Sequence, residues 1–214
     1  MKHKIEKNTV QETLILPLYS RKLCTELYPN LYQDETAVRL IDEIDYDFSE
    51  AEKNSRSLMQ RFGALEVAMR QNDLAWEVRD YLKTHPSAAV FFASGVFYYF
   101  LTQQVKALVQ QMADAFSGGV LVFDAANRTA VKMIAKTWLR TAKIKDVGAY
   151  FAVSDAPKEI GEWDNRLQVT SRGYMLGYND LRDHSVSGFF RFLARVGDNG
   201  MKMQIVKIRF GGKA

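Results

Sequence analysis

Two charged residues in this 214-residue chain stand where an α/β protein could hold a ligand. Asp124 closes the apolar run Val120–Phe123, and ligands of α/β proteins bind at the carboxyl ends of such strands. The alternative is a carboxylate that only caps a loop. Arg70 offers a guanidinium, which binds carboxylates through two parallel hydrogen bonds. Its alternative is a surface pair with Glu66 or Asp73, one helical turn away on either side.

The other reactive residue types point to little further chemistry. His3, His85 and His184 are scattered and Cys24 is the only cysteine, so we expect no metal site and no internal disulfide. We recognise no pairing of a nucleophile with a base, which suits a reaction that depends on holding two reactants in line. The single cysteine and a polar N-terminus without an apolar signal core favour a cytoplasmic protein. The longest apolar stretch, 87–101, is too short to span a bilayer, so we expect no membrane association.

The formal net charge is +4, and the basic excess lies late in the chain. Basic residues recur at every fourth position of the predicted helix 128–141, as Arg128, Lys132, Lys136 and Arg140. Such a stripe could meet an acidic partner or nucleic acid. No aromatic residue interleaves with it, so the alternative, a solvated helix face, is preferred and nucleic acid is not expected as a partner.

Arg70 and Asp124 lie in two regions of different predicted secondary structure, which meet at Pro86. Before it, spacing predicts a helix over 10–27 interrupted near Pro17, a second helix capped by Asp34, and helix 58–82 broken at Gly63. The last of these should bury Leu65, Met69, Trp76 and Tyr81.

After Pro86, apolar runs alternate with amphipathic helices. We predict buried strands at 88–97 and 120–123, which should be side-by-side parallel neighbours, and a short strand at 149–153. We also predict a helix at 157–163 and a C-terminal strand pair at 167–176 and 201–210, the last antiparallel. This order predicts an α/β fold with residues 1–86 as an N-terminal helical cap and residues 87–214 as the core, packed as one globular unit.

Several segments, in order, resemble the leucine carboxyl methyltransferase superfamily, on its bacterial branch of polyketide-type O-methyltransferases. The matching segments are 11–21 (QETLILPLYSR), 44–48 (IDYDF), 70–73 (RQND), 78–86 (VRDYLKTHP), 91–100 (FFASGVFYYF) and 116–124 (FSGGVLVFD). The resemblance implies a class I methyltransferase-like, Rossmann-like sheet in reduced form. It also implies an enzyme that moves a methyl group from S-adenosylmethionine to an oxygen of a small polyketide-like molecule or of a carboxyl substrate.

The resemblance also assigns residues to the site. By position, Arg70 lies near the methionine carboxylate of S-adenosylmethionine, and Ser94 and Gly95 form the turn beside the cofactor. Tyr19 and Arg21 match the opening helix on the substrate side. Tyr99, beside Tyr98, could line the substrate pocket, and the alternative for both tyrosines is aromatic packing in the core.

The chain departs from this family at one place. Where the family has a glycine-rich cofactor loop and an acidic strand end, Ala89-Val90 runs directly into Phe91-Phe92, and no G-x-G occurs anywhere. Three explanations of this departure remain open. The chain has an internal deletion, or this sequence lacks a segment that the natural protein has, or the ancestor never had the segment or the resemblance is mismatched.

The missing loop leaves two hypotheses. As an O-methyltransferase family member, the 214-residue form should bind S-adenosylmethionine weakly or not at all. Alternatively, the chain is a non-catalytic remnant that acts as an interaction module, because a strand at 91–97 without its neighbour would leave an exposed sheet edge. A homodimer is then the expected partner state.

Overall fold

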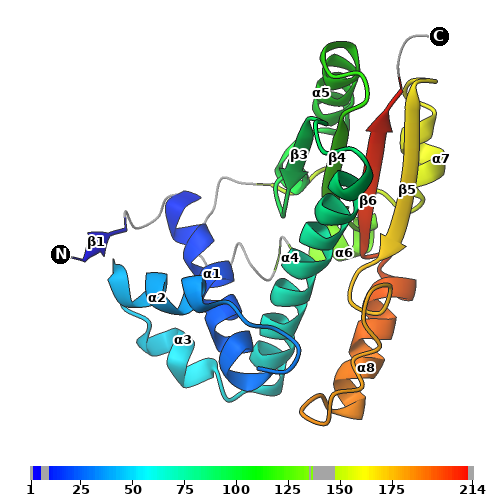
Figure 1. The fold of residues 1–214 in the computed structure, drawn as a ribbon. Helices are drawn as coiled ribbons and strands as arrows, with labels where there is room; N and C mark the ends of the chain where they lie inside the picture. The colour runs from blue at the N-terminus through cyan, green and yellow to red at the C-terminus, as the bar shows by residue number, and fades with distance from the viewer. Residues whose placement is uncertain (1, 6–9, 135, 137–147, 212–214) are drawn as a thin grey trace.

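The computed structural model describes residues 2–5, 10–134, 136 and 148–211, and its centre is a four-stranded mixed sheet (Figure 1). One edge strand and its inner neighbour are parallel to each other, and the last strand of the chain runs antiparallel to both of its neighbours. In spatial order the strands are β3 (Val90–Ala93), β4 (Val120–Ala125), β6 (Gln204–Phe210) and β5 (Leu167–Gly173).

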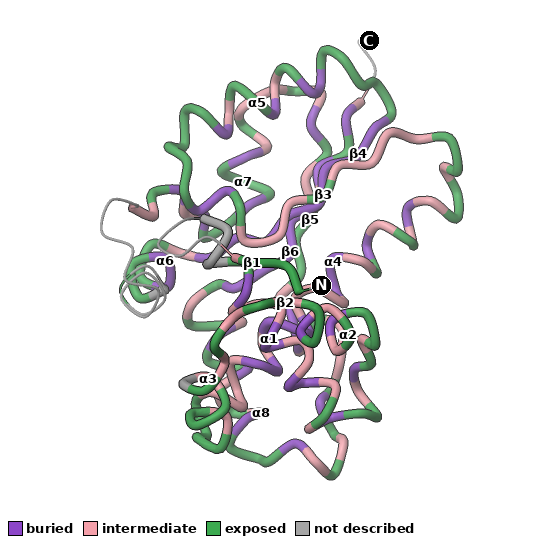
Figure 2. The backbone as a smooth tube through the Cα atoms, turned by 90° about the vertical axis from the view of Figure 1, so that its left-hand side faces the viewer, coloured by how far each residue is buried: buried purple, intermediate pink, exposed green. Residues whose placement is uncertain are grey.

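Helices cover both faces of this sheet. Helix α4 (Leu58–Thr84) crosses one face, and α5 (Thr102–Ala115) and α7 (Ala156–Gly161) lie on the other, as the view along the sheet in Figure 2 shows. Strand β4 is buried along its whole length. Because successive side chains of a strand point to opposite faces, Val122 packs with the α4 layer and Phe123 with the α5 and α7 layer.

The N-terminal helices pack around the first half of α4. They are α1 (Val10–Leu27), α2 (Glu35–Glu43) and α3 (Ser49–Asn54), and a two-residue parallel bridge joins β1 (His3–Lys4) to β2 (Ile44–Asp45). The predicted cap of α2 is confirmed, because the Asp34 carboxylate accepts a hydrogen bond from the Ala37 amide at 2.9 Å.

Both predicted helix breaks are wrong. Helix α1 continues through Pro17, and α4 continues through Gly63. A glycine in a helix costs only about 1 kcal/mol relative to alanine. The neighbouring Ala64 and Leu65 are fully buried, and their burial offsets that cost.

The remaining elements follow the sheet strands. A 3₁₀ turn, η1 (Phe97–Tyr99), follows β3, and α6 (Arg128–Ile134) follows β4. Helix α8 (Gly188–Arg195) and a π-helical turn, η3 (Val196–Gly200), connect β5 to β6. Arg128, Lys132 and Lys136 of the basic stripe are exposed, and Arg140 lies outside the described residues.

The predicted α/β fold is confirmed, and so is the parallel pairing of its first two strands. Val90 pairs with Val120 and Ala93 with Phe123, although β3 ends at Ala93 and not at Phe97. The antiparallel pairing of the C-terminal strand is also confirmed. The division into residues 1–86 and 87–214 remains a prediction, and α4 packs directly on the sheet.

Two local predictions are wrong. Segment 149–153 is not a strand. It lies against η1 and the residue after β4 instead, with the Tyr150 amide donating to the Tyr98 carbonyl at 2.7 Å and the Val153 amide to the Ala126 carbonyl at 2.9 Å. Trp76 is 41% exposed rather than a core residue, and the Arg172 guanidinium covers its ring at 5.2 Å. Within the described residues, no helix combines the length and the apolar character that crossing a membrane requires.

Candidate functional site

A buried carboxylate lies where the two parallel strands end. Asp124 is the fifth residue of β4, and Gly95 follows β3 by two residues. Because Ala93 pairs with Phe123 in parallel register, the turn after β3 lies beside Asp124. The Gly95 amide donates a hydrogen bond to Asp124 Oδ1 at 2.6 Å, which fixes the turn on the carboxylate.

Arg70 reaches the same carboxylate from α4. Its Nη1 lies 3.3 Å from Asp124 Oδ2, and the Asp124 side chain is only 1% exposed. Burial acts to lower the pKa of Arg70, but the interactions with Asp124, Tyr174, Tyr98 and Glu66 together outweigh it, and the pKa ends above its usual value. The guanidinium therefore stays charged, while its Nε is buried without a hydrogen-bond partner.

Gly95 has the backbone conformation that this contact requires. Its φ is +67°, in the left-handed region that glycine adopts without steric cost. A Cβ at this position would lie 3.6 Å from Arg70 Nη2. The absence of a side chain thus leaves the guanidinium next to the backbone of the turn.

Two tyrosines and a glutamate complete the cluster, which we call the polar site: Glu66, Arg70, Gly95, Tyr98, Asp124 and Tyr174. The Tyr174 hydroxyl donates to Glu66 Oε1 at 3.1 Å. Burial raises the pKa of Tyr98 and Tyr174 well above the usual value, so both phenols are protonated donors at neutral pH. Burial also raises the pKa of Glu66, although the Arg70 charge works against it.

The composition of the polar site suits the binding of a small zwitterion. A guanidinium can hold a carboxylate of a ligand, and a buried carboxylate can hold an ammonium group. The phenols add donors of fixed position. In this structure the guanidinium is paired with the Asp124 carboxylate through Nη1, so a ligand would have to share or divide that pair.

The structure brings together only some of the residues expected at the site. Arg70 and Gly95 are in the polar site, and Ser94 is half-buried immediately before Gly95. Tyr99 is 44% exposed next to Tyr98, and burial raises its pKa while the Arg70 charge lowers it, which places it near the site.

Tyr19 and Arg21 have structural partners elsewhere. Tyr19 is 5% exposed and stacks on Phe48 at 5.4 Å between ring centroids. The Arg21 Nε donates to Asp34 at 2.8 Å, which fastens α1 to the start of α2. Their assignment to the substrate remains a prediction.

The contribution of Tyr174 was not expected from the sequence, and Glu66 was expected only as a surface partner of Arg70. Asp124 was a candidate because it stands at a strand end, with a loop cap as the alternative. A signal for Asp124 was available. Asp124 is the only charged residue in the otherwise apolar run Val120–Ala126, and an ionised side chain inside a buried run requires a partner. No comparable signal marks Tyr174, which lies 108 residues from its partner Glu66.

No group of three or more His, Cys, Asp or Glu side chains among the described residues is arranged to hold a metal ion. Comparisons with protein-family models, with curated proteins and with solved structures yield no match to this chain.

Proposed function

We propose that this chain is a reduced class I methyltransferase-like domain of the S-adenosylmethionine-dependent O-methyltransferase type, acting on a small polyketide-like molecule or a carboxyl substrate. The observation that carries the proposal is the polar site. An arginine from α4, a left-handed glycine turn and a buried carboxylate meet at the carboxyl ends of two adjacent parallel strands.

The sheet supports the same proposal. The strand that follows His85-Pro86 lies directly beside β4 in parallel, and the chain ends in an antiparallel strand. This is the arrangement expected if the first strand–helix units of the sheet are missing and the later ones fold without them.

The residues present fit only the amino-acid end of the cofactor. Arg70 would hold its carboxylate, Asp124 its ammonium group, and Gly95 would let the ligand approach the backbone. S-adenosylmethionine supplies an electrophilic methyl group when bound, and the protein's contribution would be to align donor and acceptor. Within the described part of the chain, β3 is the edge of the sheet, and no further strand there supplies a loop for the adenosine end.

This partial fit predicts that adenosine adds nothing to binding. Methionine and S-adenosylmethionine should both bind with dissociation constants of about 1 mM or weaker, and with similar affinity, because only the shared amino-acid end is held. Titration followed by the ¹⁵N-labelled Gly95 amide signal measures this, with adenosine alone as the control. A micromolar affinity for S-adenosylmethionine would show that a complete cofactor site is present.

A second function, as a self-associating module, is favoured by the open edge of β3. This strand is the outermost of the sheet, and no charged residue occurs from Val90 to Leu101. Phe92 is 44% exposed on it, and Val96, Tyr99, Phe100 and Leu101 are also exposed. Natural edge strands usually carry charges or prolines that prevent pairing, so an uncharged edge suits pairing with a second copy around a two-fold axis.

Self-association predicts a dimer of twice the 24.5 kDa chain mass in light scattering after size-exclusion chromatography. Phe92→Lys should give a monomer, because a charge at the edge would be buried on pairing. Leu14→Lys is the matched control, since Leu14 is 65% exposed on α1. A monodisperse wild-type monomer, or equal effects of both substitutions, would rule out pairing through β3.

A further inference from the structure

A groove separate from the polar site lies between α8 and the loop that follows β5. Its volume is about 770 Å³, and it is lined by Leu176, Asp180, Arg182, Gly188, Arg191, Phe192 and Arg195. This volume is in the range of small-molecule sites. Three guanidinium groups face one carboxylate, so the groove carries an excess of positive charge.

The guanidinium groups differ in how they are held. Arg191 Nη1 donates to the carbonyls of Val186 at 2.9 Å and Leu181 at 3.3 Å, which ties the loop to α8. Its Nη2 lies 3.7 Å from the position that a Cβ on Gly188 would occupy, near the start of α8. Arg191 is therefore held in place with one end of its guanidinium turned to the groove.

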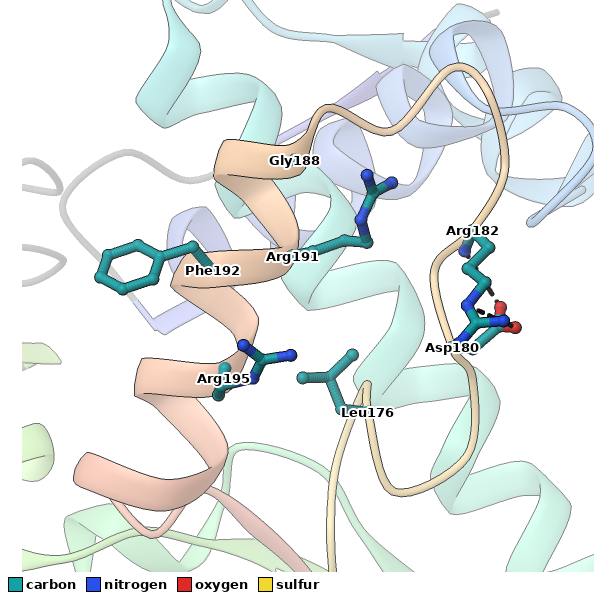
Figure 3. Close-up of a pocket in the computed structure, with 7 residues that line it drawn as sticks. All are labelled: Leu176, Asp180, Arg182, Gly188, Arg191, Phe192 and Arg195. Carbon is teal, nitrogen blue, oxygen red and sulfur yellow. Dashed lines mark hydrogen bonds and ion pairs between the residues drawn. The ribbon is translucent and has the colours of Figure 1, made fainter.

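Arg195 is one helical turn further along α8. Figure 3 shows Arg191 and Arg195 both extending from α8 toward the loop that carries Leu176 and Arg182, whereas Phe192 extends from another side of the helix. Among the residues that the structure describes, the Arg195 side chain has no hydrogen-bond or ion-pair partner. Two arginines one turn apart thus point into the same space, separated by about 6 Å along the helix axis.

Arg182 closes the groove from the loop side. Its Nε lies 3.6 Å from Asp180 Oδ2, and both side chains are largely exposed, at 81% and 70%. An exposed ion pair of this kind contributes about 0–1 kcal/mol and is easily exchanged. Arg182 is consequently available to an anion that enters the groove.

We infer that this groove binds a small molecule with two linked phosphoryl groups, a diphosphate. A guanidinium binds a phosphoryl group through two parallel hydrogen bonds. Arg191 and Arg195 would each take one phosphoryl group, and two phosphoryl groups joined through one oxygen match arginines one helical turn apart. Arg182 would neutralise further charge, and Leu176 would contact the carbon skeleton of the ligand.

Inorganic pyrophosphate is the probe, titrated calorimetrically into the full chain at low salt. We expect binding that is at least about tenfold tighter than that of inorganic phosphate and that weakens as salt is added. Arg195→Gln should weaken it about tenfold without affecting the fold, since the side chain has no partner to lose. Arg39→Gln is the matched control, because Arg39 is 71% exposed on α2 and its removal changes the net charge equally.

The outcomes of these titrations distinguish a diphosphate site from other modes of anion binding. Loss of pyrophosphate binding in Arg195→Gln but not in Arg39→Gln supports the diphosphate site. Equal effects of the two substitutions, or equal affinity for phosphate and pyrophosphate, overturn it. A single-stranded oligonucleotide that binds through Arg195 while pyrophosphate does not bind would also overturn it, in favour of a polynucleotide surface.

Discussion

Asp124→Ala is expected to lower the free energy of unfolding by about 3–5 kcal/mol. The substitution removes the partner of the Arg70 guanidinium at 3.3 Å and leaves the Gly95 amide without its acceptor. A buried charge that loses its partner costs much more than the pair contributed, because the charge remains out of contact with water. Urea unfolding followed by circular dichroism measures the loss.

An exposed ion pair of nearly equal length provides the control. Lys83 and Asp80 lie 3.4 Å apart on α4, with side chains 69% and 42% exposed. Asp80→Ala should change stability by less than about 0.5 kcal/mol. The double variant Arg70→Met with Asp124→Leu should recover most of the loss, since it removes both charges and keeps apolar volume. A single-variant loss below about 1 kcal/mol would mean that Arg70 finds water or another acceptor.

Stability should fall as the pH rises from about 4 to 7, because two acids are protonated in the folded protein. Burial raises the pKa of Asp73 and of Asp198 to about 7, and the charge of Asp198 contributes to the shift of Asp73. Both groups hold the turn that follows β5, with Asp73 Oδ2 accepting from the Met175 amide at 2.9 Å. Arg172 opposes the shift of Asp73, although more weakly than burial promotes it.

The direction of this change of stability with pH follows from proton binding. An unfolded aspartate releases its proton near pH 4, whereas these two keep theirs until about pH 7, so the folded state binds more protons between these values. The stabilisation is complete below about pH 4 and is lost as the pH rises through 7. We expect a loss of the order of 2 kcal/mol for each carboxyl group.

Asparagine substitutions test this expectation. Asp73→Asn and Asp198→Asn should each flatten the pH dependence and raise the stability at pH 8, because an amide does not ionise. Asp42→Asn, at an exposed position on α2, should leave the slope unchanged. Stability that is constant or rises between pH 4 and 7 would contradict the assignment.

The sequence predicted features that depend on nearby residues. The cap at Asp34 follows from a short polar side chain three residues before an exposed helix amide, and the structure has this bond. The run Val120–Phe123 is apolar on both faces, which is typical of a strand covered by helices on each side, and β4 is such a strand. The parallel neighbour of β4 followed from the same pattern.

Features that depend on contacts between residues far apart in the sequence could not be predicted from periodicity. The Arg70–Asp124 pair joins residues 54 positions apart, and the pairing of Asp73 with Asn179 spans 106 positions. Trp76 has the spacing of a core residue, but its ring lies at the surface beneath Arg172. Tyr19 and Arg21 were assigned by resemblance alone, and the structure shows that Phe48 and Asp34 already engage them.

Helix α4 also bears on how this protein loses its structure. Its 27 residues run past the N-terminal helices and on across the sheet, and a single apolar cluster joins residues of α1, α4, β4 and β6. Unfolding of either end of α4 would remove packing contacts from this shared cluster, and so from both the N-terminal helices and the sheet. The helical portion and the sheet are therefore thermodynamically one unit, and unfolding should be a single cooperative transition without a stable half-folded state.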